Sequence, residues 1–365
     1  MRNQIEEITK YLPRGWEEKA KEKKALVRGR EIKTAAELLE LNMLYLTSGG
    51  SFGVTSALLN LTTKVRMSKK AVYTRIQNSG EWLKWMAQEM CLQNEFSMPK
   101  PDWLERNVVA IDASDVALKG SVQSNYRLHC AFDIFACEYR TIEITDIRTG
   151  EKLTNHTINA NDIVLADRVY GTIAGMEHVR ENEGDFILRY RTKAFKIYDA
   201  QGKQINLLEE LENLKELEST SIYGYYYSGG RKETVRIVAM KKDKDAINTA
   251  QRKMTRKMNK QRGSRPSDEA LKLNEYIVLA TSLDYTESQI LELYRARWQI
   301  EKVFHTLKSM YDFGDVPSKK EETVMAWFYG KLFLAILSET ILKRECFSPE
   351  EENLMRTLGI IKPVE

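Results

Sequence analysis

The spacing of hydrophobic positions changes along the chain and divides it into segments of different predicted structure. Up to about residue 100 the apolar residues recur every three to four positions, the spacing of amphipathic helices. The clearest case is TAAELLELNMLYL, where Thr34 is placed to cap the helix and Ser48-Gly49-Gly50 to end it. Further helices are predicted at 54–61 and from Ser68 through Met86. This first region is therefore predicted to be all-helical.

After the break at Pro99-Lys100-Pro101 the pattern becomes that of strands. NVVAID is a continuous apolar run that ends in Asp112, while YRLHCAFDIF and YRTIEITDIRTG alternate as a pair of strands. An apolar run at Ile163–Ala166, a helix at about 172–180 and the segment FILRYR follow as strand, helix and strand. These segments predict an α/β fold.

Residues 192–285 interrupt the α/β pattern. They contain two alternating strands, SIYGYYYSGG and TVRIVAMKK, an acidic helix, a basic helix and a final strand, EYIVLATSL. We interpret them as a β-rich insertion. The earlier pattern then resumes and closes with AWFYGKLFLAILSETILK, an apolar helix expected to pack against the sheet.

The net charge of this chain does not indicate its partner, whereas the local distribution of charged residues does. Its 365 residues include 56 Lys and Arg and 52 Asp and Glu, a net charge of +4 that is too mild to prove a polyanionic partner. Between Arg231 and Arg265 there are 13 basic and three acidic residues. That concentration suits nucleic acid, with a solvated surface helix as the alternative.

The helical N-terminal region leaves a similar choice open. Its short helices are predicted to expose four basic residues: Lys69, Lys70, Arg75 and Lys84. This arrangement fits a helix-turn-helix-like module, and it also fits a helical bundle that only packs.

The rest of the composition argues against several classes of protein. Four scattered cysteines and four histidines form no zinc pattern and no disulfide framework, which favours a reducing cytoplasm. The N-terminus shows no apolar signal region, and no apolar run approaches the roughly 20 residues needed to cross a bilayer. We expect a soluble, cytoplasmic protein without a membrane partner.

Two aspartates follow apolar runs that are predicted to be strands. Asp112 directly ends the first run and Asp167 follows the later run Ile163–Ala166. Carboxylates at the carboxyl ends of neighbouring strands converge on one crevice, and with a further carboxylate they form a set of hard oxygen ligands that suits Mg²⁺. Asp115 competes with Asp112 for this role, and Asp133 is expected to pair or to cap.

The stretch LYRARWQIEKVFHTLKS has helical periodicity and gathers four polar residues on one stripe. At about 100° per residue, Tyr294, Arg297, Glu301 and Lys308 fall within about 60° of one another on a continuous helix. The apolar residues of the stretch occupy a neighbouring sector that faces a core. A carboxylate, two cations and a phenol at the margin of a core suit a metal ion flanked by phosphate contacts.

These motifs together resemble the insertion-sequence-four family of DDE transposases. ADRVYG, AIDAS and the spacing Y-x2-R-x3-E-x6-K carry the resemblance, which covers about residues 105–345. It implies an RNase H-like mixed five-stranded sheet flanked by helices, with a β-rich insertion before the glutamate helix. It also implies Asp112, Asp167 and Glu301 as catalytic residues and metal ligands.

The resemblance implies a domain order. The expected parts are a helical DNA-binding domain at 1–100, the catalytic domain at 101–191 and 286–345, the insertion at 192–285, and a C-terminal tail at 346–365. The implied activity is Mg²⁺-dependent DNA cleavage and strand transfer at the terminal inverted repeats of an insertion sequence, and Mn²⁺ is expected to substitute. Two other interpretations stay open. The chain could be a nuclease that cuts DNA without joining it, or a DNA-binding protein without catalytic activity.

The expected partner is double-stranded DNA, both transposon ends and target, bound by a homodimer. The expected DNA contacts are Tyr294, Arg297, Trp298, Lys308, Arg168, Lys253, Arg256 and Lys257. Trp298 is expected either to stack on a distorted terminal base or to pack partly into the core. Some relatives use a tryptophan in the insertion to form hairpin ends, whereas residues 192–285 contain none, so the cleavage route stays open.

Overall fold

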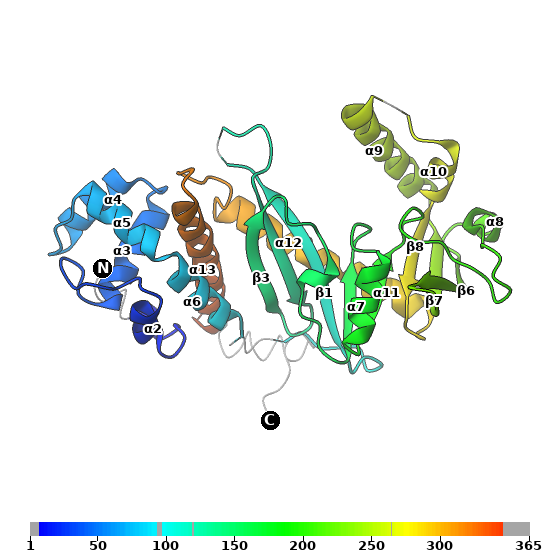
Figure 1. Cartoon of the computed structure of the whole chain (residues 1–365), viewed down its shortest axis with the longest axis horizontal. Helices are drawn as coiled ribbons and strands as arrows, with labels where there is room; N and C mark the ends of the chain where they lie inside the picture. The colour runs from blue at the N-terminus through cyan, green and yellow to red at the C-terminus, as the bar shows by residue number, and fades with distance from the viewer. Residues whose placement is uncertain (1–6, 93–96, 119, 264, 346–365) are drawn as a thin grey trace. The chain divides into compact units, whose positions relative to one another are not determined.

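The computed structural model describes residues 7–92, 97–118, 120–263 and 265–345. These residues form two compact units, here called unit 1 and unit 2. Unit 1 consists of the described residues within 1–105, 113–150 and 299–365, and unit 2 of those within 106–112 and 151–298. Figure 1 labels the elements of both units. Neither unit is a single stretch of sequence, because the chain passes between them after residue 105, within β1 (Asn107–Val116), after residue 150 and at the start of α12.

Unit 1 begins with helices, as the sequence predicts. They are α2 (Trp16–Glu22), α3 (Ala35–Thr47), α4 (Phe52–Thr62), α5 (Lys69–Asn78) and α6 (Gly80–Leu92). Thr34 caps α3 in a complete capping box with Glu37, so the predicted cap is confirmed, and Ser68 caps α5 at the predicted start of a helix. The single helix predicted from Ser68 through Met86 is wrong, since α5 ends at Asn78 and α6 starts at Gly80.

The long helix of unit 1, α13 (Glu321–Glu345), packs mainly on α6, α5 and α3. Trp327 meets Tyr45 edge to face at 5.8 Å between ring centroids. The helix was predicted to pack against the sheet, and it does so at few residues. Phe328 packs against Tyr126, and Ile144 N donates a hydrogen bond to Tyr329 Oη. The apolar side of this helix therefore mostly covers other helices.

By length and composition alone, Glu321–Leu342 of α13 meets the criteria for a membrane span, contrary to the sequence expectation. However, 67% of its apolar window is buried within the protein. Burial against neighbouring helices is the environment of a core helix in a globular unit.

The mixed α/β class with helix-flanked strands is confirmed. In unit 1, the order of hydrogen-bonded strands is β3-β2-β1, with β2 (Tyr126–Asp133) antiparallel to β3 (Glu138–Asp146). In unit 2, β1 is parallel to β4 (Asp162–Ala166), and β4 is parallel to β5 (Asp185–Arg189). These five strands correspond to the five predicted for the catalytic sheet.

Three strands from the predicted insertion extend this arrangement in unit 2, where the order is β1-β4-β5-β8-β7-β6. They are β6 (Ser219–Ser228), β7 (Arg231–Lys241) and β8 (Tyr276–Thr281), all antiparallel to their neighbours. β8 pairs directly with β5, so the segment adds strands to the sheet that it interrupts in sequence.

The remaining elements of unit 2 are helical. They are the short turn η1 (Leu153–Asn155), α7 (Ile173–Glu181), α8 (Leu207–Leu211), α9 (Lys244–Arg262), α10 (Asp268–Leu273) and α11 (Glu287–Ala296). The predicted acidic helix, NLLEELENLKELE, is helical only over α8, whereas the predicted basic helix, TAQRKMTRKMNKQRG, begins earlier in the structure, at Lys244 of α9. None of residues 244–260 is buried, and Figure 1 shows α9 projecting from β8 and its neighbours with α10 at its base.

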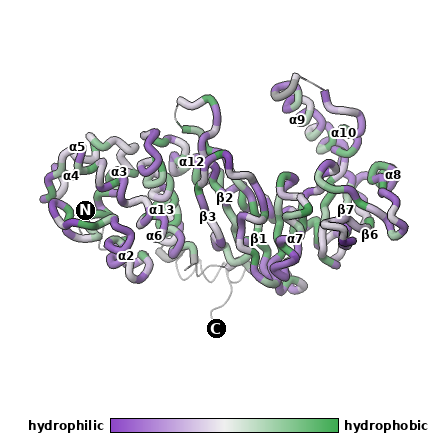
Figure 2. Tube along the Cα trace, in the orientation of Figure 1, coloured by the Kyte–Doolittle hydropathy of each residue, from purple (hydrophilic) through white to green (hydrophobic). Residues whose placement is uncertain are grey.

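Figure 2 shows hydrophobic and hydrophilic positions interleaved along nearly every element, as amphipathic elements require. The core of unit 2 is most apolar at its parallel strands, where Ile163–Ala166 and Phe186–Leu188 are completely buried. This rigid pair of strands positions the candidate site.

Candidate active site

Asp112 and Asp167 occupy matching positions after two paired strands of unit 2. The parallel register of β1 and β4 aligns Val108 with Ile163 and ends by aligning Ile111 with Ala166. Asp112 and Asp167 are the next residue on each chain segment. Two carboxylates therefore follow the last aligned pair, as the sequence predicts.

One detail of this prediction is wrong, because β1 does not end at Asp112. The strand continues to Val116, and β2 is its other hydrogen-bonded neighbour. Asp112 thus lies where pairing with β4 stops rather than where the strand stops. Its backbone is held on both sides by extended structure, which restricts its side chain more than a loop would.

Asp112 is paired with Arg297 in unit 2. Arg297 Nη1 donates to Asp112 Oδ2 at 3.3 Å, and the two side chains are 10% and 19% exposed. The guanidinium also lies 5.8 Å from the ring centroid of Tyr294, and burial raises the pKa of that phenol while nearby Arg297 opposes the change. The structure thus brings three predicted site residues together around one carboxylate.

The predicted continuous helix through Tyr294 and Lys308 is wrong. α11 ends at Ala296 and α12 (Trp298–Met310) starts two residues later. Arg297 N bonds to Tyr294 O at 3.2 Å, a three-residue spacing that replaces the four-residue spacing of an α-helix.

Glu301 and Lys308 both lie on α12 in unit 1. Glu301 is partly exposed beside the buried residues Ile300 and Phe304, so it borders an apolar face as predicted. Lys308 Nζ donates to the backbone oxygen of Asp115 at 2.8 Å. The Asp115 carboxylate pairs with Arg127 at 2.7 Å and is 45% exposed, whereas the carboxylate of its competitor Asp112 is 19% exposed.

Burial decides the predicted roles of Asp133 and Trp298. Asp133 is completely buried, pairs with Arg140 at 2.7 Å and accepts a hydrogen bond from Ala136 N, so it pairs and caps. Trp298 is 61% exposed, which argues against partial packing into the core, one of its two expected roles. Its stacking on a base stays a prediction.

In unit 2 a group of cations includes Arg168, a predicted DNA contact, together with Lys242 and Arg189, which were not predicted from the sequence. Burial lowers the pKa of Lys242 to about 8, and the positive charges of Arg189 and Arg168 add to the effect. Arg189 is the last residue of β5, as Ala166 is of β4, and Arg168 directly follows Asp167. The signal in the sequence is the pair Arg189 and Arg191 in FILRYR, at the carboxyl end of a predicted strand.

The candidate DNA contacts of the insertion lie on α9. Lys253, Arg256 and Lys257 are all exposed and share one face at three- and four-residue spacing. Their side chains are available to a partner.

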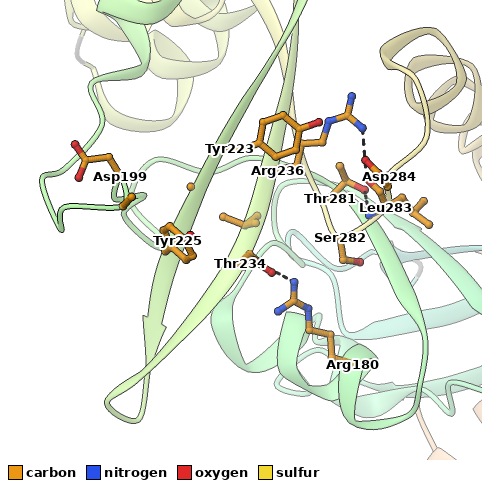
Figure 3. A pocket seen from close by; sticks show the side chains of 13 residues that line it. Arg180, Asp199, Tyr223, Tyr225, Thr234, Arg236, Thr281, Ser282, Leu283 and Asp284 are labelled. Carbon is orange, nitrogen blue, oxygen red and sulfur yellow. Dashed lines mark hydrogen bonds between the residues drawn. The ribbon is translucent and has the colours of Figure 1, made fainter.

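A hollow of about 410 Å³ in unit 2 (Figure 3) has neither Asp112 nor Asp167 in its lining. Ser282, in its lining, donates to Asp185 at the start of β5, whereas Asp167 follows the far end of the parallel neighbour β4. Arg180 and Arg236 in the lining are already bonded to Thr234 O and Glu287. The hollow is therefore no extension of the aspartate site.

Asp112 and Asp167 are the carboxylates of unit 2 that could take part in a metal site. Among the residues that the structure describes, no group of three or more His, Cys, Asp or Glu side chains is close enough to hold one. Mg²⁺ is commonly held by one or two carboxylates together with water and substrate phosphate oxygens. Asp112 and Asp167 meet that requirement in kind and number.

Comparison with known proteins identifies relatives over most of the chain. A family model described as "Transposase DDE domain" matches residues 103–337. The "Putative transposase InsL for insertion sequence element IS186A" of Escherichia coli K12 is 27% identical over 333 residues, 87% of this chain and 88% of that protein. The transposase for insertion sequence element IS421 of Escherichia coli is 27% identical over 334 residues, with the same shares. The transposase for IS1151 of Clostridium perfringens is 40% identical over 70 residues, 19% of this chain and 15% of that protein.

Proposed function

Because this chain belongs to the family of DDE-domain transposases and is a DNA transposase, we propose that it cuts and joins DNA at the terminal inverted repeats of an insertion sequence, with a divalent metal ion. The observation that supports this activity best is the register that aligns β1 with β4 and leaves Asp112 and Asp167 as neighbouring carboxylates. Asp112, Asp167 and Glu301 are the residues proposed to hold Mg²⁺, for which Mn²⁺ substitutes. Mg²⁺ bound there would activate the attacking hydroxyl and stabilise the leaving oxygen.

The side chains around the aspartates hold and position DNA in this proposal. Arg297 orients Asp112, and its planar guanidinium suits a phosphate oxygen on its other side. Arg168 and Trp298 are exposed, as a DNA contact requires. The further contacts proposed are Tyr294, Lys308, Lys253, Arg256 and Lys257.

The same reasoning gives the proposed assembly and location. An insertion sequence has two ends, and strand transfer needs both, so two copies of the chain are proposed to act together on DNA. Their DNA substrate places them in the cytoplasm at the nucleoid.

The activity is tested with the purified chain, Mg²⁺ and labelled duplexes cut from the ends of the element that encodes it. The variants Asp167→Asn and Glu301→Gln should bind these duplexes but not cleave them. Glu292→Gln on α11, an exposed carboxylate, is the matched control and should cleave normally. Cleavage by Asp167→Asn or Glu301→Gln at the normal rate would remove that residue from the catalytic role.

Joining is tested separately with pre-cleaved ends and a target plasmid. A transposase joins them, whereas a nuclease without strand transfer leaves the plasmid unjoined. Specific binding without cleavage or joining would instead identify a catalytically silent DNA-binding protein.

A further inference from the structure

Helices α3, α4 and α5 of unit 1 pack on one another around a shared core (Figure 1). Hydrogen bonds to the backbone of Met67 hold the turn from α4 to α5, and this residue is 4% exposed. Met67 N donates to Asn60 Oδ1 at 2.9 Å, and Ser56 Oγ donates to Met67 O at 2.6 Å. Because both backbone groups of the turn bind to side chains of α4, the start of α5 is fixed relative to α4.

The two sides of α5 differ sharply. Val72 and Ile76 are completely buried against the core. Lys70, Thr74 and Asn78 recur at four-residue spacing and are all exposed. The outer side of α5 is thus a row of hydrogen-bonding groups on a helix that its neighbours hold in place.

All the charged residues of the segment from the turn through α5 are positive. Residues 63–78 contain no acidic residue and five basic residues: Lys64, Arg66, Lys69, Lys70 and Arg75. Arg75 donates to Arg28 O at 2.5 Å, and the partly buried Lys84 of α6 lies 5.2 Å from the Tyr329 ring centroid, so both are used within unit 1, contrary to the predicted exposure. The other four basic residues of the segment are exposed: Lys64, Arg66, Lys69 and Lys70.

A cation from a distant part of unit 1 adds to this surface. Lys320, just before α13, lies 5.8 Å from the ring centroid of Tyr73, and its side chain is 53% exposed. Lys319 beside it is also exposed. Positive charge therefore borders α5 along its turn and beside Tyr73, and an anionic partner complements it.

The dimensions and chemistry favour duplex DNA as that partner. An α-helix with its side chains is about 10–12 Å across and fits a major groove about 12 Å wide. Lys, Thr and Asn are residue types that hydrogen-bond to base edges there, and lysines at the margin neutralise phosphates.

We propose that α5 is the helix that reads the sequence of the transposon ends, with Lys70, Thr74 and Asn78 facing the base edges in the major groove. The exposed cations of the turn and of the first helical position contact the phosphates: Lys64, Arg66 and Lys69. This assignment rests on the proposed function, because it names the part of the chain that recognises the substrate of that activity.

The test measures dissociation constants of the full chain for duplexes cut from the ends of its element and for shuffled duplexes of the same composition. Thr74→Ala and Asn78→Ala should each weaken binding to the end duplex about 5- to 100-fold and leave binding to the shuffled duplex unchanged. Lys69→Ala should weaken both equally and reduce the slope of log K against log salt by about 1.

Two exposed residues of unit 1 provide matched controls. Thr47→Ala removes a hydroxyl that, like that of Thr74, donates to the backbone four residues earlier. Lys21→Ala removes an exposed lysine of α2. Both should bind like the unmodified chain, and circular dichroism should show that every variant is folded.

The outcomes separate the inference from the proposed function. If the unmodified chain prefers the end duplex and Thr74→Ala and Asn78→Ala keep that preference in full, α5 does not read the ends. If the unmodified chain shows no preference, end recognition fails and the assignment of α5 fails with it. Joining of pre-cleaved ends by the unmodified chain at saturating protein concentration reports on the catalytic proposal independently.

Discussion

Arg297 donates a hydrogen bond to the Asp112 carboxylate across a separation of 185 residues, and both side chains are largely shielded from water. A guanidinium in this position offsets the cost of partly burying the carboxylate charge. The same contact fixes the direction in which Asp112 points beside Asp167. Arg297 is therefore tied to the aspartate site even without DNA.

The first prediction concerns this ion pair. Arg297→Met keeps most of the side-chain length but removes the charge, so the free energy of unfolding should fall by about 1–3 kcal/mol. Urea unfolding of Arg297→Met, Asp112→Asn and the double variant should show that the two changes are not additive. Arg295→Met, at the exposed neighbouring position, should change stability by no more than about 0.5 kcal/mol. Additive effects would show that the pair contributes no coupling energy.

A second prediction separates the two aspartates of β1. Asp112→Asn should lower the rate of end cleavage by about 10³-fold or more, as the loss of a catalytic group does. Asp115→Asn should change it only a few-fold, since the Asp115 carboxylate faces Arg127 and is 45% exposed. The measurement is single-turnover cleavage of a labelled end duplex. The reverse order of effects would transfer the catalytic role to Asp115.

A third prediction follows from Lys242, whose folded pKa is about 8. An unfolded lysine titrates near 10.4, so between about pH 8 and pH 10 the unfolded chain holds a proton that the folded chain has lost. This group therefore makes the folded chain more stable as pH rises through that range and less stable as pH falls through it towards 8. Urea unfolding of Lys242→Met and of the unmodified chain at about pH 7.5 and pH 9.5 tests the difference. Equal pH dependence in both would contradict the depressed pKa.

A fourth prediction concerns helix packing in unit 1. A Cβ added at Gly330 of α13 would lie 2.6 Å from Leu46 Cδ2, and Leu46 is 1% exposed and cannot readily move. Gly330→Ala should therefore lower the free energy of unfolding by about 1–3 kcal/mol. Gly53 in α4 has no atom within 4 Å of such a Cβ, so Gly53→Ala should raise it by about 0.5–1 kcal/mol. Thermal unfolding monitored by circular dichroism compares the two, and equal effects would contradict the close packing of α13 on α3.

A fifth prediction addresses the basic face of α9. Replacing Lys253, Arg256 and Lys257 together by Gln should weaken binding to end and shuffled duplexes alike, because phosphate contacts carry no sequence information. The slope of log K against log salt should fall by about 0.9 for each phosphate that is no longer neutralised. The variant Lys21→Gln, Lys24→Gln changes exposed lysines of unit 1 and should leave the slope unchanged. An unchanged slope in the α9 variant would exclude these side chains from the DNA interface.

Local patterns in the sequence were enough to predict most elements and the acidic residues. The cap at Thr34 and the helix after Thr172 were predictable because caps and helical spacing depend on residues only a few positions apart. Asp167 was predictable for the same reason, since a fully buried parallel strand is a continuous apolar run and the residue after it lies at the strand end. The spacing of Tyr294, Arg297, Glu301 and Lys308 identified the family without any knowledge of their contacts.

The tertiary structure alone decided which of these residues meet. Nothing in the local pattern shows that Arg297 binds Asp112, that β1 continues past Asp112, or that α13 covers helices more than strands. Each of these outcomes depends on a partner far away in sequence, and hydrophobic spacing records only that a side is buried, not what buries it. The break between α11 and α12 at Arg297 was also unpredictable from the sequence. Its three-residue hydrogen bond leaves the apolar periodicity on either side unchanged.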